Sequence, residues 1–137
     1  MPTKPSSFSG KYTEAVGRRK TAIARIRVFT GSSSRIVNGL PAADYFHLPK
    51  LTAIAFSPLL IVDFPGKTGL SVVVKGGGLA AQAEAIRLGL SRALVKIDSG
   101  FRLRLKQAGF LKRDPRMVER KKPGLHKARR AHQWQKR

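Results

Sequence analysis

The sequence predicts an α+β fold in which one small sheet is packed by one long helix and by several short helices. Two observations predict this class: apolar residues alternate with polar ones over residues 21–29, and they recur at helical spacing over residues 79–97. A third observation adds an extended basic tail, because residues 109–137 are rich in Lys and Arg and show no sustained apolar period. We expect a disordered leader at 1–10, a globular body at 11–108 and the tail at 109–137.

The first predicted strand covers residues 21–29. One face holds Ala22, Ala24, Ile26 and Val28, and the other holds Thr21, Ile23, Arg25, Arg27 and Phe29. Arg18, Arg19 and Lys20 stand at the entrance of this strand. The outer face of an ordinary sheet would explain Arg25 and Arg27, whereas the five basic residues together favour a surface that faces phosphate groups.

A second short strand is predicted at 35–38 and is closed by a tight turn at Asn38-Gly39, since both residues tolerate positive φ. Pro41 can start a short helix through Phe46, because proline is accepted at the first helical position.

A further helix is expected from Lys50 to Phe56, ended by Ser57-Pro58. The next segment, 59–63, is apolar and β-prone. Residues 70–75 are rich in Val and apolar on both faces, which predicts a strand in the centre of the sheet.

Gly76, Gly77 and Gly78 end that strand and open the longest helix. Its apolar stripe consists of Leu79, Ala83, Ile86, Leu90, Leu94 and Ile97, whereas Gln82, Glu84, Arg87 and Ser91 are expected away from the stripe. Residues 101–108 are expected to add one or two helical turns that Gly109 ends with a left-handed cap.

The charge of the chain points to a polyanionic partner. The net charge is +21, and residues 101–137 hold 14 Lys and Arg against 2 acidic residues, so +12 of the total lies in this last part. Too little apolar surface is present in 109–137 to offset the entropy of ordering it. The tail is therefore expected to be solvated, or to be ordered against a polyanion.

Catalytic and metal-binding chemistry find little support in the sequence. There is no cysteine, the three histidines share no metal-ligand spacing, and the seven acidic residues are scattered without a catalytic pair. We therefore expect no enzyme, no cofactor and no metal site. The three glycines could offer backbone N–H groups to a phosphate at a helix start, but no P-loop Lys-Ser/Thr follows them, and a tight strand-to-helix turn explains them as well.

RNA suits this pattern better than other polyanions do. The tail has no apolar face for a membrane surface, and the one strong helix is too poor in charge to read DNA. A small body with a long basic extension matches the irregular grooves of a folded RNA.

Four motifs in order resemble the bacterial type of the ribosomal small-subunit protein nine family. They are Gly17-Arg18-Arg19-Lys20-Thr21-Ala22, Val37-Asn38-Gly39, Gly76-Gly77-Gly78 with Gln82-Ala83-x-Ala85-Ile86-Arg87, and Ala108-Gly109-Phe110-Leu111-x-Arg113-Asp114-Pro115-Arg116-Met117-Val118-Glu119-Arg120-Lys121-Lys122. The resemblance extends from about Tyr12 to Arg137. The chain departs from the usual pattern at Pro123 and at Trp134.

The resemblance implies a body like domain two of ribosomal protein S-five, seated on ribosomal RNA in the head of the small subunit beside neighbouring head proteins. It implies a structural role in translation in a cytoplasmic ribosome or in an organellar ribosome of bacterial type, with no membrane partner. The residues that it implies for ribosomal RNA are Arg18, Arg19, Lys20, Arg25, Arg27, Lys112, Arg113, Arg116, Arg120, Lys121, Lys122, Lys127, Arg129 and Arg130. Lys136 and Arg137 occupy the last two positions, which in this family reach transfer RNA in the peptidyl site.

Two alternatives stay open on sequence grounds. The same fold class houses small-molecule kinases that bind phosphate at a glycine-rich helix start. A histone-like compactor of nucleic acid is the other alternative, and it would bind duplex DNA as well as structured RNA.

Overall fold

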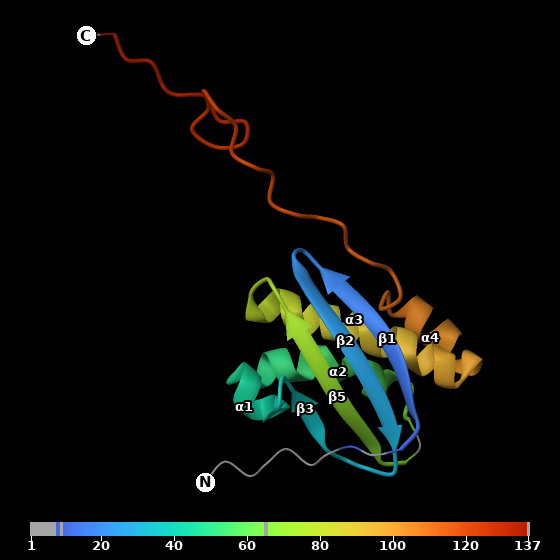
Figure 1. Cartoon of the computed structure of the whole chain (residues 1–137). Helices are drawn as coiled ribbons and strands as arrows, with labels where there is room; N and C mark the ends of the chain where they lie inside the picture. The colour runs from blue at the N-terminus through green and yellow to red at the C-terminus, as the bar shows by residue number, and fades with distance from the viewer. Residues whose placement is uncertain (1–7, 9, 65, 137) are drawn as a thin grey trace.

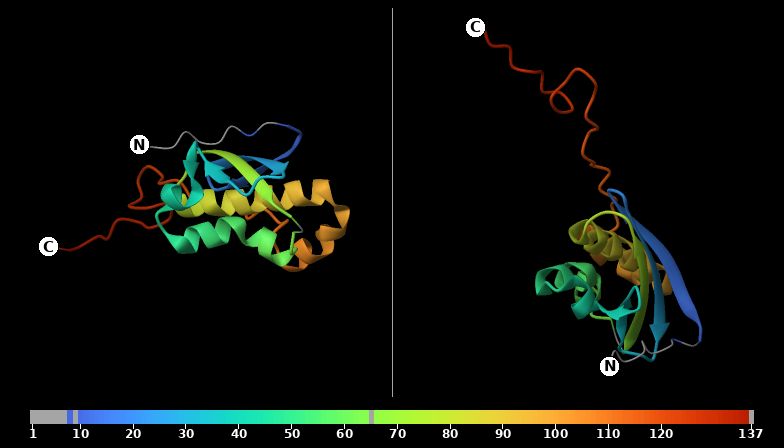
Figure 2. Two further views of the ribbon diagram at one scale, coloured as in Figure 1. Left: turned by 90° about the horizontal axis from the view of Figure 1, so that it is seen from below. Right: turned by 60° about the vertical axis from the view of Figure 1, so that its left-hand side comes forward.

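The computed structural model describes residues 8, 10–64 and 66–136, and these form a five-stranded sheet with the strand order β1-β2-β5-β3-β4. The elements are β1 (Tyr12–Arg19), β2 (Ala22–Thr30), β3 (Arg35–Val37), β4 (Leu40–Pro41), α1 (Ala42–Phe46), α2 (Pro49–Ile61), β5 (Thr68–Lys75), α3 (Leu79–Ile97), the 3-10 helix η1 (Ser99–Phe101) and α4 (Arg102–Gln107). The helices lie on one face of the sheet and leave the other face open (Figure 1, Figure 2). The predicted α+β class is confirmed.

Strand β1 was not predicted from the sequence, and neither was the two-residue strand β4. Strand β1 pairs antiparallel with β2 over its whole length, from Tyr12 opposite Phe29 to Arg19 opposite Ala22. The turn between the two strands uses a left-handed residue, Lys20, with φ 51°. The inward positions of β1 include alanine and glycine, so its alternation in hydrophobicity is too weak to predict a strand.

The alternation of β2 is confirmed by burial. Ala22, Ala24, Ile26 and Val28 are all buried on the helix side of the sheet. On the opposite face Ile23 is 44% exposed, but Phe29 is buried. The reason is an aromatic contact, since Phe8 stacks on Phe29 with ring centroids 4.8 Å apart. The rest of the expected disordered leader lies mostly outside the described residues.

The turn at Asn38-Gly39 is confirmed, with φ of 49° and 84° at the two residues. The side chain of Asn38 continues the pairing of β3 with β5, because its Oδ1 accepts from the Val74 N–H at 2.9 Å and its Nδ2 donates to the Val74 carbonyl at 2.9 Å. The predicted short helix is confirmed as α1, but it begins at Ala42, because Pro41 belongs to β4 and is the N-cap residue.

Helix α2 is longer than predicted. Ser57-Pro58 does not end it, and the segment 59–63, expected to be β-prone, supplies its last turn instead. Pro58 lacks the N–H that would bond the Ile54 carbonyl one turn earlier. The Ser57 hydroxyl donates to that carbonyl at 2.8 Å, so the proline leaves no buried acceptor without a partner.

Strand β5 is the central strand, as predicted, and the three glycines connect it to α3 with Gly78 as the N-cap residue. The predicted stripe of α3 is too narrow, because the helix packs against β1 and β2 on one side and against α2 on another. Gln82 and Ser91, expected away from the core, are therefore buried, whereas Leu79 and Ile97 at the helix ends are 41% and 36% exposed.

The body closes with α4, which buries Leu105 completely. Gly109 takes φ 76° and ends this helical segment, as predicted for a left-handed cap. Among the helices within the described residues, none is long and apolar enough to cross a membrane.

Candidate nucleic-acid interface

The open face of the sheet mixes basic and apolar side chains. Register places Arg25 on β2 between Val16 on β1 and Val73 on β5, and it places Arg18 opposite Ile23. The valines and the isoleucine of this set are each more than one third exposed, and both arginines are exposed. Such a surface offers charge for phosphates and flat apolar contact for sugars or bases.

Arg27 is on the same face but is partly engaged by the protein. Its Nε donates to Glu14 Oε2 at 2.8 Å, and its guanidinium lies 4.7 Å from the centroid of the Tyr12 ring. The hydrogen bond to Glu14 raises the pKa of Arg27. Lys75 also joins this face, opposite Ile23. Lys75 was not among the predicted ligands, although its place two residues after Val73 on the predicted strand was a usable signal.

The remaining two basic residues of the hairpin differ from each other. Lys20 is exposed at the tip of the turn. Arg19 points to the helix side, where its Nε donates to Glu84 Oε2 at 2.5 Å and its Nη1 donates to the Arg116 carbonyl at 2.8 Å. Its Nη2 also lies 3.2 Å from Asp114 Oδ2, and only 13% of the side chain is exposed. The side chain of Arg19 is thus occupied by protein contacts and lies apart from Arg18, Arg25 and Arg27 on the open face.

The tail leaves the body at the end of the sheet that holds the β1–β2 turn and extends away from it (Figure 1, Figure 2). Its nine predicted RNA ligands are all exposed. They are Lys112, Arg113, Arg116, Arg120, Lys121, Lys122, Lys127, Arg129 and Arg130. Lys136 is exposed as well, and Arg137 lies outside the described residues.

The two acidic residues of the tail are paired with nearby basic side chains. Arg116 donates to both oxygens of Asp114, with Nε 3.0 Å from Oδ1 and Nη2 2.8 Å from Oδ2. Glu119 pairs with Lys122 and with Arg129, the latter at 2.9 Å. A loop follows in which the His126 N–H donates to the Arg130 carbonyl at 2.7 Å. Most cationic side chains of the tail keep no carboxylate partner within the described chain.

Two of the three glycines, Gly76 and Gly77, form a close contact between the loop and the β1–β2 hairpin. A Cβ on Gly76 would lie 2.5 Å from the Thr21 carbonyl oxygen, and both Gly76 and Gly77 have positive φ. The side-chain amide of Gln82 donates to the Gly76 carbonyl at 3.1 Å and thereby ties the loop to α3. Close packing therefore explains Gly76 and Gly77, while a contact between the three glycines and a phosphate stays a prediction.

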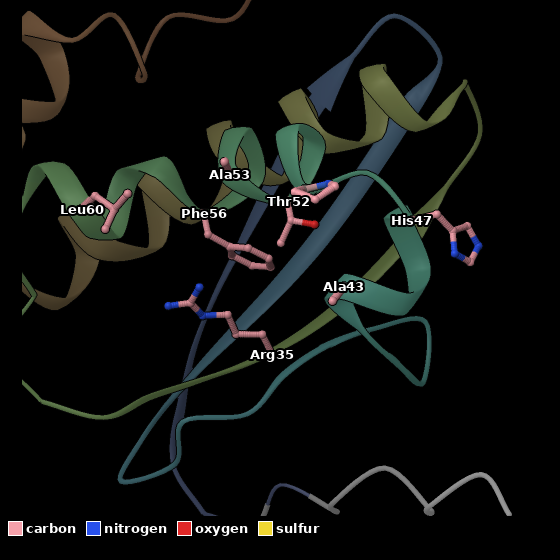
Figure 3. Close-up of a pocket in the computed structure, with 8 residues that line it drawn as sticks. Arg35, Ala43, His47, Thr52, Ala53, Phe56 and Leu60 are labelled. Carbon is pink, nitrogen blue, oxygen red and sulfur yellow. The ribbon is translucent and has the colours of Figure 1, made fainter.

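A cavity of about 320 Å³ lies between β3, α1 and α2 (Figure 3). Its lining is mostly apolar and includes Phe56, and the guanidinium of Arg35 lies 5.0 Å from the centroid of that ring. His47 and Thr52 are its other polar residues. This lining contains neither a carboxylate nor a nucleophile paired with a base, so it supplies no catalytic set. Among the described residues no three His, Asp or Glu side chains gather to hold a metal ion.

Comparison with known proteins agrees with the motifs. The sequence pattern of the family described as "Ribosomal protein S9/S16" matches residues 17–137. The "Small ribosomal subunit protein uS9" of Cytophaga hutchinsonii is 49% identical over 123 residues, which cover 90% of this chain and 96% of that protein.

Proposed function

The chain belongs to the ribosomal protein S9/S16 family and is a structural, non-enzymatic constituent of the small ribosomal subunit, and we propose that it binds ribosomal RNA of the subunit head and contacts transfer RNA in the peptidyl site. Family membership removes the kinase alternative. In this proposal the body at 11–108 docks the protein on ribosomal RNA, and the tail at 109–137 binds along the RNA in an extended conformation.

The observation that carries the proposal is the exposed, largely unpaired charge of the tail. Residues 110–137 hold eleven Lys and Arg against two acidic residues, and the structure gives the described part of this segment little apolar contact after Leu111. A segment with so few apolar contacts cannot stabilise a single conformation by itself. Binding to a phosphate backbone neutralises its charge and releases the counterions of the nucleic acid.

The open sheet face supports the body's part in this role. Arg18, Arg25 and Lys75 stand on it without a carboxylate partner within the described chain, and Arg27 adds a partly shielded charge. The apolar residues between them suit sugars and bases. This face and the base of the tail present cations on two sides of one body, which fits an RNA that surrounds the protein.

The tip of the tail is the proposed contact with transfer RNA. Lys136 supplies a point charge, and the guanidinium of Arg137 can fork two hydrogen bonds onto one phosphate. The nearby Trp134 is 80% exposed and offers a ring for stacking. Deleting Lys136 and Arg137 should leave assembly nearly intact but weaken transfer RNA in the peptidyl site. Unchanged binding and unchanged accuracy of translation would count against this role.

The proposal is tested against the histone-like alternative by filter binding. The full chain is titrated with fragments of small-subunit ribosomal RNA from the head and with random duplex DNA at the same salt concentration. We expect clearly tighter binding to the ribosomal RNA. Equal affinities at matched salt would favour a general compactor of nucleic acid and overturn the proposal.

A further inference from the structure

The first residues of the tail are held against the body. After the left-handed turn at Gly109, the Phe110 N–H donates to the Leu105 carbonyl at 3.0 Å, and Phe110 and Leu111 pack against the core. Farther on, Arg19 of β1 bonds the Arg116 carbonyl and faces the Asp114 carboxylate. The chain is therefore fixed at both ends of a short bend, at Phe110 and at Asp114 to Arg116.

Arg19 is the residue that closes this bend. It joins three segments, because its other contact is Glu84 on α3. With only 13% of its side chain exposed, and with each of its nitrogens facing a protein oxygen, it has little left to offer a ligand. Asp114, in turn, is shared between Arg19 and Arg116. Its negative charge is thus balanced inside the cluster.

An open pocket of about 450 Å³ lies between α3 and this bend of the tail. Its lining brings together four cations, Arg87, Lys112, Arg113 and Arg116, with Asp114 as the one acidic residue. Arg116 is itself paired with Asp114, whereas Arg87, Lys112 and Arg113 have no carboxylate partner within the described chain, so the lining keeps an excess of positive charge. We call this cavity the junction pocket.

Arg87 is the only one of the four cations that comes from the body. Its guanidinium lies 4.9 Å from the centroid of the Phe110 ring, and the residue is half-buried. No ion pair within the described chain involves it, so its charge is supported by a ring face and not by a carboxylate. Contact with a ring occupies the face of a guanidinium and leaves the N–H groups at its edge for an anion.

We propose that the junction pocket binds a phosphate group of the RNA backbone, with Arg87 as a contact residue and Arg19 as the residue that positions the pocket. This inference rests on the proposed RNA binding and assigns to it one site and a residue that the sequence motifs did not mark as a ligand. A phosphate is favoured because the cations converge on one cavity and because Arg87 is held in place before binding.

The first experiment measures how binding of the full chain to ribosomal RNA depends on salt. Arg87→Gln should lower the slope of log K against log salt by roughly 0.7–0.9, the change expected for one lost phosphate contact. Arg87→Lys should keep the slope while weakening the affinity, since a point charge replaces the fork. Arg104→Gln is the control, because Arg104 is exposed on α4 outside the pocket.

The outcomes separate this proposal from the one on which it rests. If the unaltered chain shows no salt-dependent binding to ribosomal RNA, the proposed function fails. If the unaltered chain binds and Arg87→Gln leaves the slope unchanged, or lowers it no more than Arg104→Gln does, the junction pocket is refuted while RNA binding stands.

A second measurement works without RNA. Inorganic phosphate is titrated into the isotope-labelled full chain, and the NMR signals of the Gly109 amide and the Arg87 Nε–H are followed. We expect saturable shifts at both in the unaltered chain, a lost shift at Gly109 in Arg87→Gln, and a weaker one in Arg19→Gln. Shifts spread evenly over the basic surface, or a Gly109 shift unaffected by Arg87→Gln, would overturn the proposal.

Discussion

Adding one methyl group to Gly17 should strongly destabilise the body. A Cβ at this position would lie 1.9 Å from the Ala85 carbonyl oxygen and 2.4 Å from the Gly89 nitrogen, both backbone atoms of α3. Because real Cβ atoms essentially never approach other atoms within 3.0 Å, α3 must retreat from β1 by about 1 Å or more. The helix also packs on α2 and β2, so such a shift loosens most of the core.

The magnitude follows from what overpacking costs. Forced contacts in a well-packed interior cost about 1–3 kcal/mol and occasionally more. Here the atoms that the new methyl group meets belong to the backbone of α3, so no side-chain rotation can relieve the clash. We expect Gly17→Ala to lower the free energy of unfolding by about 3 kcal/mol or more, a large part of the roughly 5–15 kcal/mol typical of a domain.

The assay is urea unfolding followed by far-UV circular dichroism. The matched control is Gly78→Ala, where the added methyl group meets nothing within 4 Å and φ is −96°. That control should lose no more than about 1 kcal/mol, from a poorer helix cap. If Gly17→Ala unfolds within about 0.5 kcal/mol of the unaltered chain, the close contact of β1 with α3 is not what positions the helix.

Three further predictions concern the core, the turn and the junction. Leu105→Ala should cost about 2–5 kcal/mol of unfolding free energy because the side chain is fully buried, while Leu103→Ala, at a side chain 65% exposed, should cost little in the same urea assay. Asn38→Ala should cost about 2 kcal/mol, since it removes both bonds to Val74 and places alanine at positive φ; a loss under about 0.5 kcal/mol would contradict the pairing. Hydrogen bonds from the Arg116 side chain and backbone, with the charge of Arg19, hold the pKa of Asp114 well below its usual range. A lowered folded-state pKa contributes stability above the ordinary value of about 3.9, and this stability is lost only as pH falls through the folded-state pKa. The Asp114 carboxyl group should therefore stay ionised below pH ~4, as followed by its chemical shift in NMR. A titration near the ordinary value would mean that the junction contacts do not form in solution.

Local sequence patterns predicted correctly those elements whose position in the fold follows from a short stretch of residues. The alternation on β2, the central position of β5 and the glycine start of α3 are properties of short stretches, and each is confirmed. Strand β1 was not predicted because its inward positions hold glycine and alanine, which allow close packing against α3 but give no strong alternation in hydrophobicity. Helix α2 was predicted to end too early, because the helix continues through Pro58. The Ser57 hydroxyl donates to the Ile54 carbonyl in place of the missing N–H of Pro58.

Long-range pairing is the information that the sequence did not reveal. Arg19 stands between two other basic residues, which suggested a phosphate ligand. Its partners in the structure are Glu84, 65 residues away, and the carbonyl of Arg116, 97 residues away. Arg87 was likewise expected outside the core stripe and appears in a family motif, but it was not predicted to be a ligand. Its place in the junction pocket depends on where the tail bends back, which no local pattern encodes.

The salt dependence of RNA binding, compared between the full chain and a chain ending at Gly109, tests the central claim most directly. Residues 110–137 carry a net charge of +9, from eleven Lys and Arg and two acidic residues. If each net charge neutralises one phosphate, removing them should lower the slope of log K against log salt by up to roughly 6–8. An unchanged slope would contradict the account, because the tail would then contribute nothing to RNA binding.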